Sequence, residues 1–205
     1  WLDLKNPYVT YEPSYIESLW WIIKQIWEKG LLYKGHKVVP HCPRCGTALS
    51  SHEVALGYRE IEEDSIFVKF RLKDKKDTYL LAWTTTPWTL PGNVALAVDP
   101  KLFYVEAEKN GERFILAEGL APKVLGDFRK IRRFRGEKLV GTLYEPLFPG
   151  AIETDKKAWY VVPAPFVTLD VGTGIVHIAV MYGEEDYLLG KKFDLPSVHT
   201  VDEGG

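Results

Sequence analysis

The sequence predicts an α+β fold, in which a β-barrel-like domain with peripheral helices follows a helix and a zinc-knuckle-like segment. Three observations predict it. An apolar stripe at helical spacing lies near the start, and a Cys-x-x-Cys motif follows. From about residue 57, short stretches rich in β-branched and aromatic residues alternate with Gly and Pro. Many short strands with such punctuation favour a barrel or sandwich over a parallel βαβ sheet.

Length and composition narrow the class of protein. The 205 residues, 46% of them hydrophobic, suit one substantial domain with an appendage. A net charge of −2 excludes a uniformly basic nucleic-acid binder, although not a local basic patch. No apolar run approaches a membrane span, and the only two cysteines share one motif, which favours a reducing, cytoplasmic setting. Because the chain starts at Trp1 and ends at residues 203–205, Glu-Gly-Gly, we expect a piece of a longer polypeptide.

The first predicted element is a helix over residues 14–29. Ser14 and Glu17 match a capping box behind Pro13, and Gly30 supplies the stop. Apolar residues follow at helical spacing: Ile16, Leu19, Trp20, Ile23, Ile26 and Trp27. We interpret this stripe as a packing face, which in a longer protein would lie against a neighbouring domain.

The second element is the Cys-x-x-Cys segment within residues 36–56. A Cys-x-x-Cys turn presents two thiolates to one ion, so Cys42 and Cys45 are predicted to form half of a structural zinc site. No second paired motif accompanies them, although three histidines are nearby: His36, His41 and His52. The alternative is two plain thiols without metal.

The remaining elements are mostly strands. They are expected over residues 65–72, 78–86, 93–98, 103–118, 159–164 and 174–180. Asn110 and Gly111 predict a hairpin turn inside the fourth stretch, and residues 184–192 predict a short helix. The basic run at residues 123–138 is typical of a solvated strand face, with phosphate contact as the alternative.

The chemistry is expected in WTTTPWTLPGN, residues 83–93. Threonines are ordinary in strands, but Pro87 and Pro91 end this strand by removing two backbone donors. A strand that breaks in this way directs hydroxyl and N–H groups into open space. That arrangement suits holding a water molecule and an oxyanion without a charged nucleophile.

A second block, GTGIVHIAVMYGEEDY, covers residues 172–187. Taken alone, its features have plain explanations. The Gly-Thr-Gly turn is a flexible start to a strand. His177 suits a hydrogen-bonded core position, and Asp186 suits the N-terminus of a helix, where negative charge is favoured.

Together, the two blocks resemble the motifs of the editing (CP1 insertion) domain of the isoleucyl-tRNA synthetases, of the class I aminoacyl-tRNA synthetase family. The related valyl and leucyl motifs place Arg-Pro where this chain has Thr86-Pro87. In the second motif the histidine stands nine residues before the aspartate, as here. Residues 15–58 resemble the approach to that insertion from the catalytic core. The likeness thus covers nearly the whole chain.

The resemblance implies hydrolytic proofreading of valyl-tRNA(Ile), and of valyl-adenylate as a further substrate. It implies catalytic roles for Thr84, Thr85, Thr86 and Asp186, and substrate-binding roles for Trp88, Thr89, Asn93 and His177. Asp186 would bind the substrate ammonium, while the threonines position water and shape a pocket for small residues. No cofactor is implied for editing. ATP and Mg²⁺ belong to the full-length enzyme only, because its ATP-binding signatures are absent here.

The resemblance also assigns partners and domains. Residues 1–56 would link to the synthetase core, and residues 57–205 would form the editing domain. The expected partners are the tRNA(Ile) 3′ end with its valyl-adenosine moiety and the synthetase core, with no membrane and a monomeric state. Val180, Met181 and Tyr182 depart from the family pattern and are expected to alter one pocket wall. Two rival functions stay open: a non-catalytic tRNA-docking module, and an inactive fragment that binds small analogues only.

Overall fold

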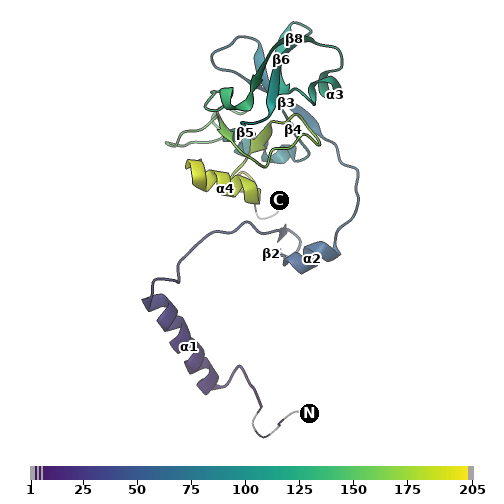
Figure 1. The fold of residues 1–205 in the computed structure, drawn as a ribbon. Coiled ribbons are helices and arrows are strands. Elements are labelled where there is room, and N and C mark those ends of the chain that lie inside the picture. Colours follow the sequence, from purple (N-terminus) through teal and green to yellow (C-terminus); the bar gives the residue numbers. More distant parts are fainter. Residues whose placement is uncertain (1–2, 4, 6, 203–205) are drawn as a thin grey trace. The chain divides into compact units, whose positions relative to one another are not determined.

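The computed structural model describes residue 3, residue 5 and residues 7–202. Trp1 and residues 203–205, from which a longer polypeptide was expected, lie outside this part. The chain forms two compact units, residues 1–37 and 38–205, whose ribbon is drawn in Figure 1. No helix in the described part is long and apolar enough to cross a lipid bilayer.

The first unit contains one helix, α1 (Pro13–Glu28). The predicted capping box is wrong: Glu12 is the N-cap and no side chain caps the helix. Proline favours the first helical position, so the helix starts one residue before Ser14, whose carbonyl accepts a bond from Ser18 Oγ instead. None of its residues is buried. The described residues therefore leave the apolar stripe uncovered, and its packing role stays a prediction.

The second unit opens with the cysteine segment. Strands β1 (His41–Cys42) and β2 (Thr47–Ala48) pair as a small antiparallel hairpin. Helix α2 (Ser51–Leu56) follows, and it carries the capping box that α1 lacks. Ser50 Oγ accepts the N–H of Glu53 at 3.3 Å, and the Glu53 carboxylate accepts the N–H of Ser50 at 2.8 Å.

A five-stranded sheet has the order β3-β4-β7-β6-β8. Its strands are β3 (Ile66–Arg71), β4 (Thr78–Thr84), β6 (Phe103–Lys109), β7 (Glu112–Ala117) and β8 (Arg129–Arg135). Among the described strand pairs of this sheet, β4 and β7 are parallel and the others are antiparallel. The predicted hairpin between β6 and β7 is confirmed, with Asn110 and Gly111 both at positive φ.

A three-stranded sheet has the order β10-β5-β9, with β5 (Ala95–Val98), β9 (Tyr160–Pro163) and β10 (Val176–Ile178). The predicted α+β class is confirmed, but the barrel is wrong: in the described residues the sheets stay open. The reason is the turn after β4. The 3₁₀ helix η1 (Pro87–Gly92) redirects the chain, so β4 and β5 join different sheets instead of one continuous ladder.

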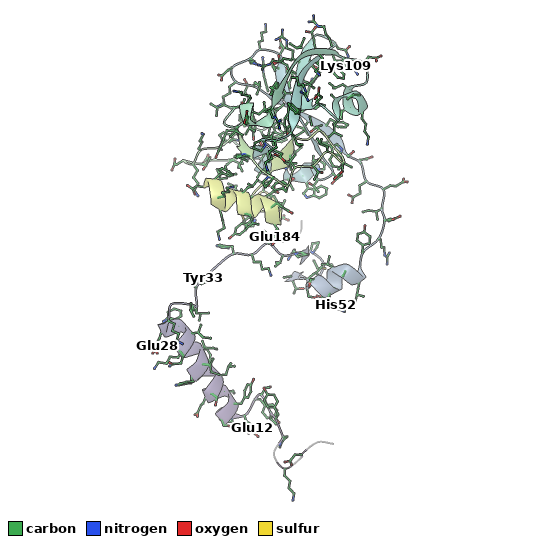
Figure 2. All side chains as sticks on the ribbon, in the orientation of Figure 1. Glu12, Glu28, Tyr33, His52, Lys109 and Glu184 are labelled. Atoms are coloured by element: carbon green, nitrogen blue, oxygen red, sulfur yellow. The ribbon has the colours of Figure 1, made fainter. Side chains whose placement is uncertain are left out.

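Short helices complete the unit: α3 (Ala121–Leu125), the 3₁₀ helix η2 (Gly136–Lys138) and α4 (Glu184–Phe193). The helix predicted at residues 184–192 is confirmed as α4. One apolar cluster joins both sheets and includes Phe70, Leu80, Leu96 and Tyr144. A second cluster joins β5, β9 and β10 to α4 through residues such as Leu189. Figure 2 shows the crowded side chains of this unit.

Candidate functional site

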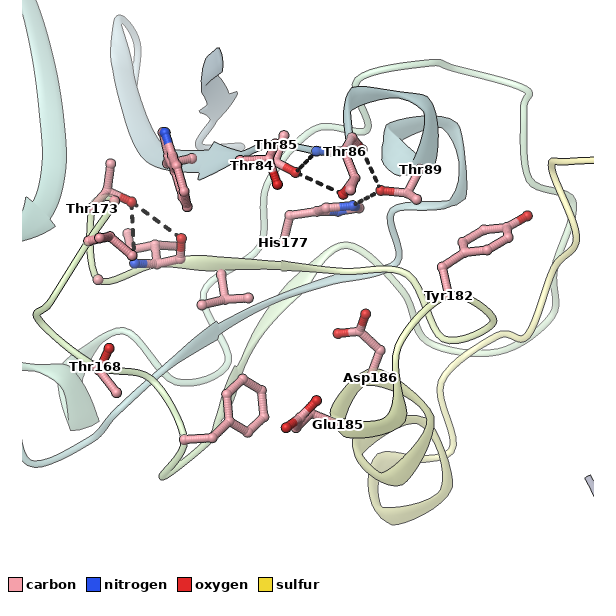
Figure 3. A pocket seen from close by; sticks show the side chains of 17 residues that line it. Thr84, Thr85, Thr86, Thr89, Thr168, Thr173, His177, Tyr182, Glu185 and Asp186 are labelled. Carbon is pink, nitrogen blue, oxygen red and sulfur yellow. Dashed lines mark hydrogen bonds between the residues drawn. The ribbon is translucent and has the colours of Figure 1, made fainter. Parts of the chain in front are cut away.

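One cavity, which we call the threonine pocket, has a volume of about 370 Å³. It lies where the end of β4 and the start of η1 face β10 and the first turn of α4 (Figure 3). Its lining residues are Trp83, Thr84, Thr85, Thr86, Thr89, Phe166, Thr168, Val171, Gly172, Thr173, Gly174, Ile175, Val176, His177, Tyr182, Glu185 and Asp186.

Three threonines are locked together at the strand end. Thr84 Oγ1 accepts the backbone N–H of Thr86 at 3.0 Å and lies 3.2 Å from Thr86 Oγ1. Thr89 Oγ1 donates to the carbonyl of Thr86 at 2.8 Å, and the Thr89 N–H binds the same carbonyl at 3.1 Å. These side chains replace the ladder bonds that the strand loses at Pro87, which makes this wall of the pocket stiff.

Thr85 differs from its neighbours. It is half-buried and lines the threonine pocket, yet its hydroxyl makes no hydrogen bond to any described residue. A hydroxyl can donate one hydrogen bond and accept two. Thr85 is therefore the threonine of the run best able to bind a water molecule or a substrate oxygen.

His177 is buried, with 8% of its surface exposed, and both ring nitrogens have partners. Its Nε2 lies 2.8 Å from Thr89 Oγ1, and its Nδ1 lies 3.0 Å from Asn93 Nδ2. Burial lowers the pKa of His177 to about 4, so the ring is neutral at physiological pH. A neutral imidazole with both nitrogens bonded is a poor general base.

The partners of Asn93 fix which nitrogen of His177 carries the proton. A backbone carbonyl can only accept, so the atom 2.9 Å from the oxygen of Ala95 must be the amide nitrogen of Asn93. That nitrogen also donates to Nδ1 of His177, which must therefore be unprotonated. The proton is on Nε2, which donates to Thr89 Oγ1.

Asp186 stands in the first turn of α4, whose N-cap is Gly183. The pKa of Asp186 is raised to about 7, mainly by burial and to a smaller extent by the nearby charge of Glu185, while a hydrogen bond from the backbone of Ala179 acts in the opposite direction. Asp186 is half-buried and has no cationic partner among the described residues, so its carboxylate would gain strongly from one. The pocket thus offers a binding position for an ammonium group.

The structure brings most of the predicted site residues together. Six of the eight predicted catalytic and substrate-binding residues line the threonine pocket: Thr84, Thr85, Thr86, Thr89, His177 and Asp186. The other two lie elsewhere. Trp88 is 57% exposed and outside the lining, and Asn93 is 3% exposed beneath it. The prediction that these two touch substrate has no support in the geometry.

Sequence reasoning missed several lining residues. Phe166 and Thr168 precede the second motif, in a stretch without any recognisable pattern. Glu185 was visible only as part of an acidic cluster. Of Val180, Met181 and Tyr182, which depart from the family pattern, Tyr182 lines the pocket, and its hydroxyl lies 3.0 Å from Thr200 Oγ1. Their effect on the pocket wall stays a prediction.

Cys42 and Cys45 lie on and beside the β1–β2 hairpin. The backbone N–H of Cys45 lowers the pKa of the Cys42 thiol, and the Cys42 thiol raises the pKa of Cys45. In the described part of the chain, however, no three His, Cys, Asp or Glu side chains gather to hold a metal ion. A structural zinc site needs four ligands, so these residues do not make one by themselves.

Comparisons with known proteins agree on one family. The model for "tRNA synthetases class I (I, L, M and V)" matches residues 1–173. The chain is 60% identical to the isoleucine–tRNA ligase of Clostridium novyi and 51% identical to that of Thermus thermophilus. Both alignments cover 100% of this chain but 20% of the relative, so the chain spans about a fifth of these proteins.

Solved structures share the fold. The crystal structure of GlLeuRS-CP1 matches with a TM-score of 0.52 and 23% identity, over 63% of this chain and 60% of that one. The editing domain of the cytosolic leucyl-tRNA synthetase of P. knowlesi matches with a TM-score of 0.51 and 16% identity, over 64% of each chain. This chain therefore has the fold of these CP1 editing domains.

Proposed function

The chain belongs to the class I tRNA synthetases of the I, L, M and V group, and from that premise we propose that it is the editing domain of an isoleucine-specific enzyme. Its substrate would be valine esterified to the 3′ end of tRNA(Ile), with valyl-adenylate as a second substrate. Its partners would be that tRNA end and the synthetase core. The observation that carries the proposal is the threonine pocket, which combines a half-buried carboxylate with threonine hydroxyl groups and has no Ser, Cys or Lys side chain in its lining.

Asp186 would hold the substrate by its α-ammonium group. The carboxylate lines the pocket without a cationic partner among the described residues, and its partial burial strengthens a charge-assisted bond. Fixing the amine fixes the ester carbonyl relative to the threonine wall. Much of the catalysis would come from this orientation.

The threonine run would then position the attacking water. Thr85 has the free hydroxyl, while Thr84 and Thr86 are held by each other. The oxygen of the water forms a bond to the carbonyl carbon, the bond from that carbon to the 3′ oxygen breaks, and the 3′ oxygen leaves with a proton from the water. No general base is required of His177, because an aminoacyl ester is already activated.

Selectivity would be steric. A synthetase discriminates poorly against a substrate that lacks one methylene, which is worth only about 1–3 kcal/mol, a magnitude taken from the isoleucine–valine pair itself. A second site that admits only the smaller residue overcomes this limit. The hydrogen bonds among Thr84, Thr86 and Thr89 give the wall the stiffness that such exclusion needs.

The first rival is a docking module that uses the basic run at residues 123–138, which contains strand β8. Four of the seven basic side chains in this run are paired with acids: Arg129 with Glu108, Arg132 with Glu106, and Lys130 and Arg133 with Glu118. This pairing reduces the positive charge that the run offers to phosphates. The geometry therefore favours hydrolysis over docking.

The test is deacylation of mischarged valyl-tRNA(Ile) by this chain at several salt concentrations. We expect turnover in the parent and none in Asp186→Ala, with an unchanged far-UV spectrum. Binding that weakens steeply with salt, without turnover, would favour the docking module. Hydrolysis of valyl-adenosine alone, without hydrolysis of the tRNA, would show that presentation by the rest of the synthetase is needed. Retained turnover in Asp186→Ala would remove the ammonium anchor.

A further inference from the structure

Glu106, on β6, is a buried carboxylate outside the threonine pocket, and three cations share it. Its side chain is 3% exposed. Lys75 Nζ lies 3.6 Å from Oε2, Arg113 Nη1 lies 3.4 Å from Oε1, and Arg132 Nε lies 2.7 Å from Oε2. These cations come from the turn between β3 and β4, from β7 and from β8. One carboxylate thus brings together basic side chains from three segments of the chain.

The three cations exceed what the carboxylate requires. A buried charge needs an opposite charge beside it, and Arg132 at 2.7 Å supplies one. Lys75 and Arg113 add two more, which leaves a surplus of two positive charges around the carboxylate. The neighbouring ion pair between β6 and β8, Arg129 with Glu108, joins one cation to one acid. The two pairings of β8 with β6 therefore differ in net charge.

The surplus charge is exposed in a form that suits phosphate. The side chains of Lys75, Arg113 and Arg132 are 42%, 49% and 52% exposed. A guanidinium group has five N–H donors, and the carboxylate takes one from each arginine. The remaining guanidinium donors make no hydrogen bond to a described residue. Two such donors of one guanidinium match two oxygens of a phosphate group.

The group around Glu106 is distant from the threonine pocket. Arg113 pairs with Thr78 at the start of β4, whereas Thr84 at the end of this strand lines the pocket. Six residues of strand span about 20 Å. The first turn of α4, at the pocket, carries three acidic residues instead, and Figure 1 shows α4 and β8 at opposite ends of the second unit. The cations are thus placed to meet a bound RNA away from its 3′ end.

We propose that Lys75, Arg113 and Arg132, oriented by Glu106, form a phosphate-binding site for the backbone of the substrate RNA. The identity of this RNA rests on the proposed editing function. Contacts to phosphate give affinity and position the RNA without reading its sequence. The site differs from the docking rival, because only Arg132 belongs to the basic run at residues 123–138 and because binding here would assist hydrolysis in the threonine pocket.

The first test measures the binding of uncharged tRNA(Ile) to the folded chain between about 50 and 200 mM salt. The test variants are Arg113→Gln and Lys75→Gln, which both leave Glu106 paired with Arg132. Each should weaken binding about threefold to tenfold at low salt and reduce the slope of log K against log salt by about one. Arg129→Gln is the matched control, because it also removes one positive charge yet lies outside the group. It should bind like the parent.

Three outcomes of this test would overturn the proposal. Equal losses in Arg129→Gln and in the test variants would show that overall charge, and not this group, binds the RNA. Parental affinity and slope in both Arg113→Gln and Lys75→Gln would show that no phosphate is bound here. Polyglutamate that binds as tightly as the RNA, and with the same loss in the variants, would assign the surface to an acidic protein segment.

The second test separates the phosphate site from the threonine pocket. Arg113→Gln should raise KM for valyl-tRNA(Ile) and leave kcat unchanged, and it should leave KM for valyl-adenosine, which has no phosphate backbone, at the parent value. A rise in KM for both substrates would make Arg113 a support of the pocket and overturn the proposal. If the parent hydrolyses neither substrate, the proposed function fails, while binding of uncharged tRNA still decides the phosphate site. If Arg113→Gln does not fold, the same expectations apply to Lys75→Gln, whose residue lies in an exposed turn.

Discussion

Replacing Asp186 by asparagine should make the folded chain more stable above neutral pH while abolishing hydrolysis. Asparagine has nearly the same shape, and its Oδ1 can keep the hydrogen bond that the backbone of Ala179 supplies. It carries no charge, so it avoids the desolvation that raises the pKa of the aspartate. It also loses the charge-assisted bond to the substrate ammonium.

The expected change in unfolding free energy follows from the pKa of Asp186. The pKa of Asp186 rises from 3.8 in an unfolded chain to about 7 in the folded one. Between these values the folded state binds more protons than the unfolded state, so stability falls as pH rises. About three pKa units at 1.36 kcal/mol each give a cost of about 4 kcal/mol above pH 7, an upper bound for one substitution. The cost vanishes below about pH 4.

The shifted pKa of His177 makes stability depend on pH in the opposite direction. Its pKa is lowered from 6.5 to about 4, so the unfolded state binds more protons between those values and stability rises with pH. In the parent the two groups therefore offset each other between about pH 4 and 6.5. Because His177 is present in both proteins, its effect cancels in the difference between Asp186→Asn and the parent.

The assay is urea unfolding of both proteins at pH 4, 6 and 8. The difference in unfolding free energy should be near zero at pH 4 and should grow toward about 4 kcal/mol at pH 8. Glu184→Gln is the control, since Glu184 is an exposed carboxylate in the same helical turn. A difference for Asp186→Asn that does not change with pH would refute the reasoning from a half-buried, ionisable carboxyl group.

Three further predictions concern the wall, the core and the cysteines. Thr86→Ala should enlarge the pocket and let the chain hydrolyse correctly charged isoleucyl-tRNA; no gain in that assay would count against steric exclusion at this residue. Gly136→Ala should destabilise the fold by about 1–3 kcal/mol, because its Cβ would come 2.2 Å from a backbone carbonyl oxygen. Gly119→Ala, whose Cβ would meet nothing closer than 3.8 Å, should have little effect in the same thermal melts. Joint replacement of Cys42 and Cys45 by serine should leave deacylation unchanged, because neither lines the pocket, and a large loss would show that the hairpin matters for catalysis.

Local patterns predicted the elements better than their arrangement. Asn110 and Gly111 adopt positive φ, which few other residues tolerate, so the hairpin turn could be predicted from these two residues. Pro87 and Pro91 correctly marked the end of a strand. Nothing local indicated that the chain would then change sheets, or that β4 would pair in parallel with β7. Those pairings depend on packing between segments far apart in sequence, and they produce two open sheets instead of a barrel.

The same limit applies to the site. The run of threonines and the spacing from His177 to Asp186 could be recognised, and the structure places these residues around one cavity. Asn93 belongs to the same motif, but its side chain is used to support His177 rather than to line the cavity. The hydrogen bond from the hydroxyl of Tyr144 to Asn93 Oδ1 could not be predicted from sequence, because it joins residues 51 positions apart.

The turn η1 has a consequence for biosynthesis. It separates β4 from β5, and three of the four neighbours of these strands, β7, β9 and β10, come later in the chain. As the nascent polypeptide leaves the ribosome, the threonines therefore emerge well before the segments that hold them in place. Long-range pairings form late, so we expect this cavity to be among the last parts to take shape. A partly synthesised polypeptide would then lack the assembled threonine pocket.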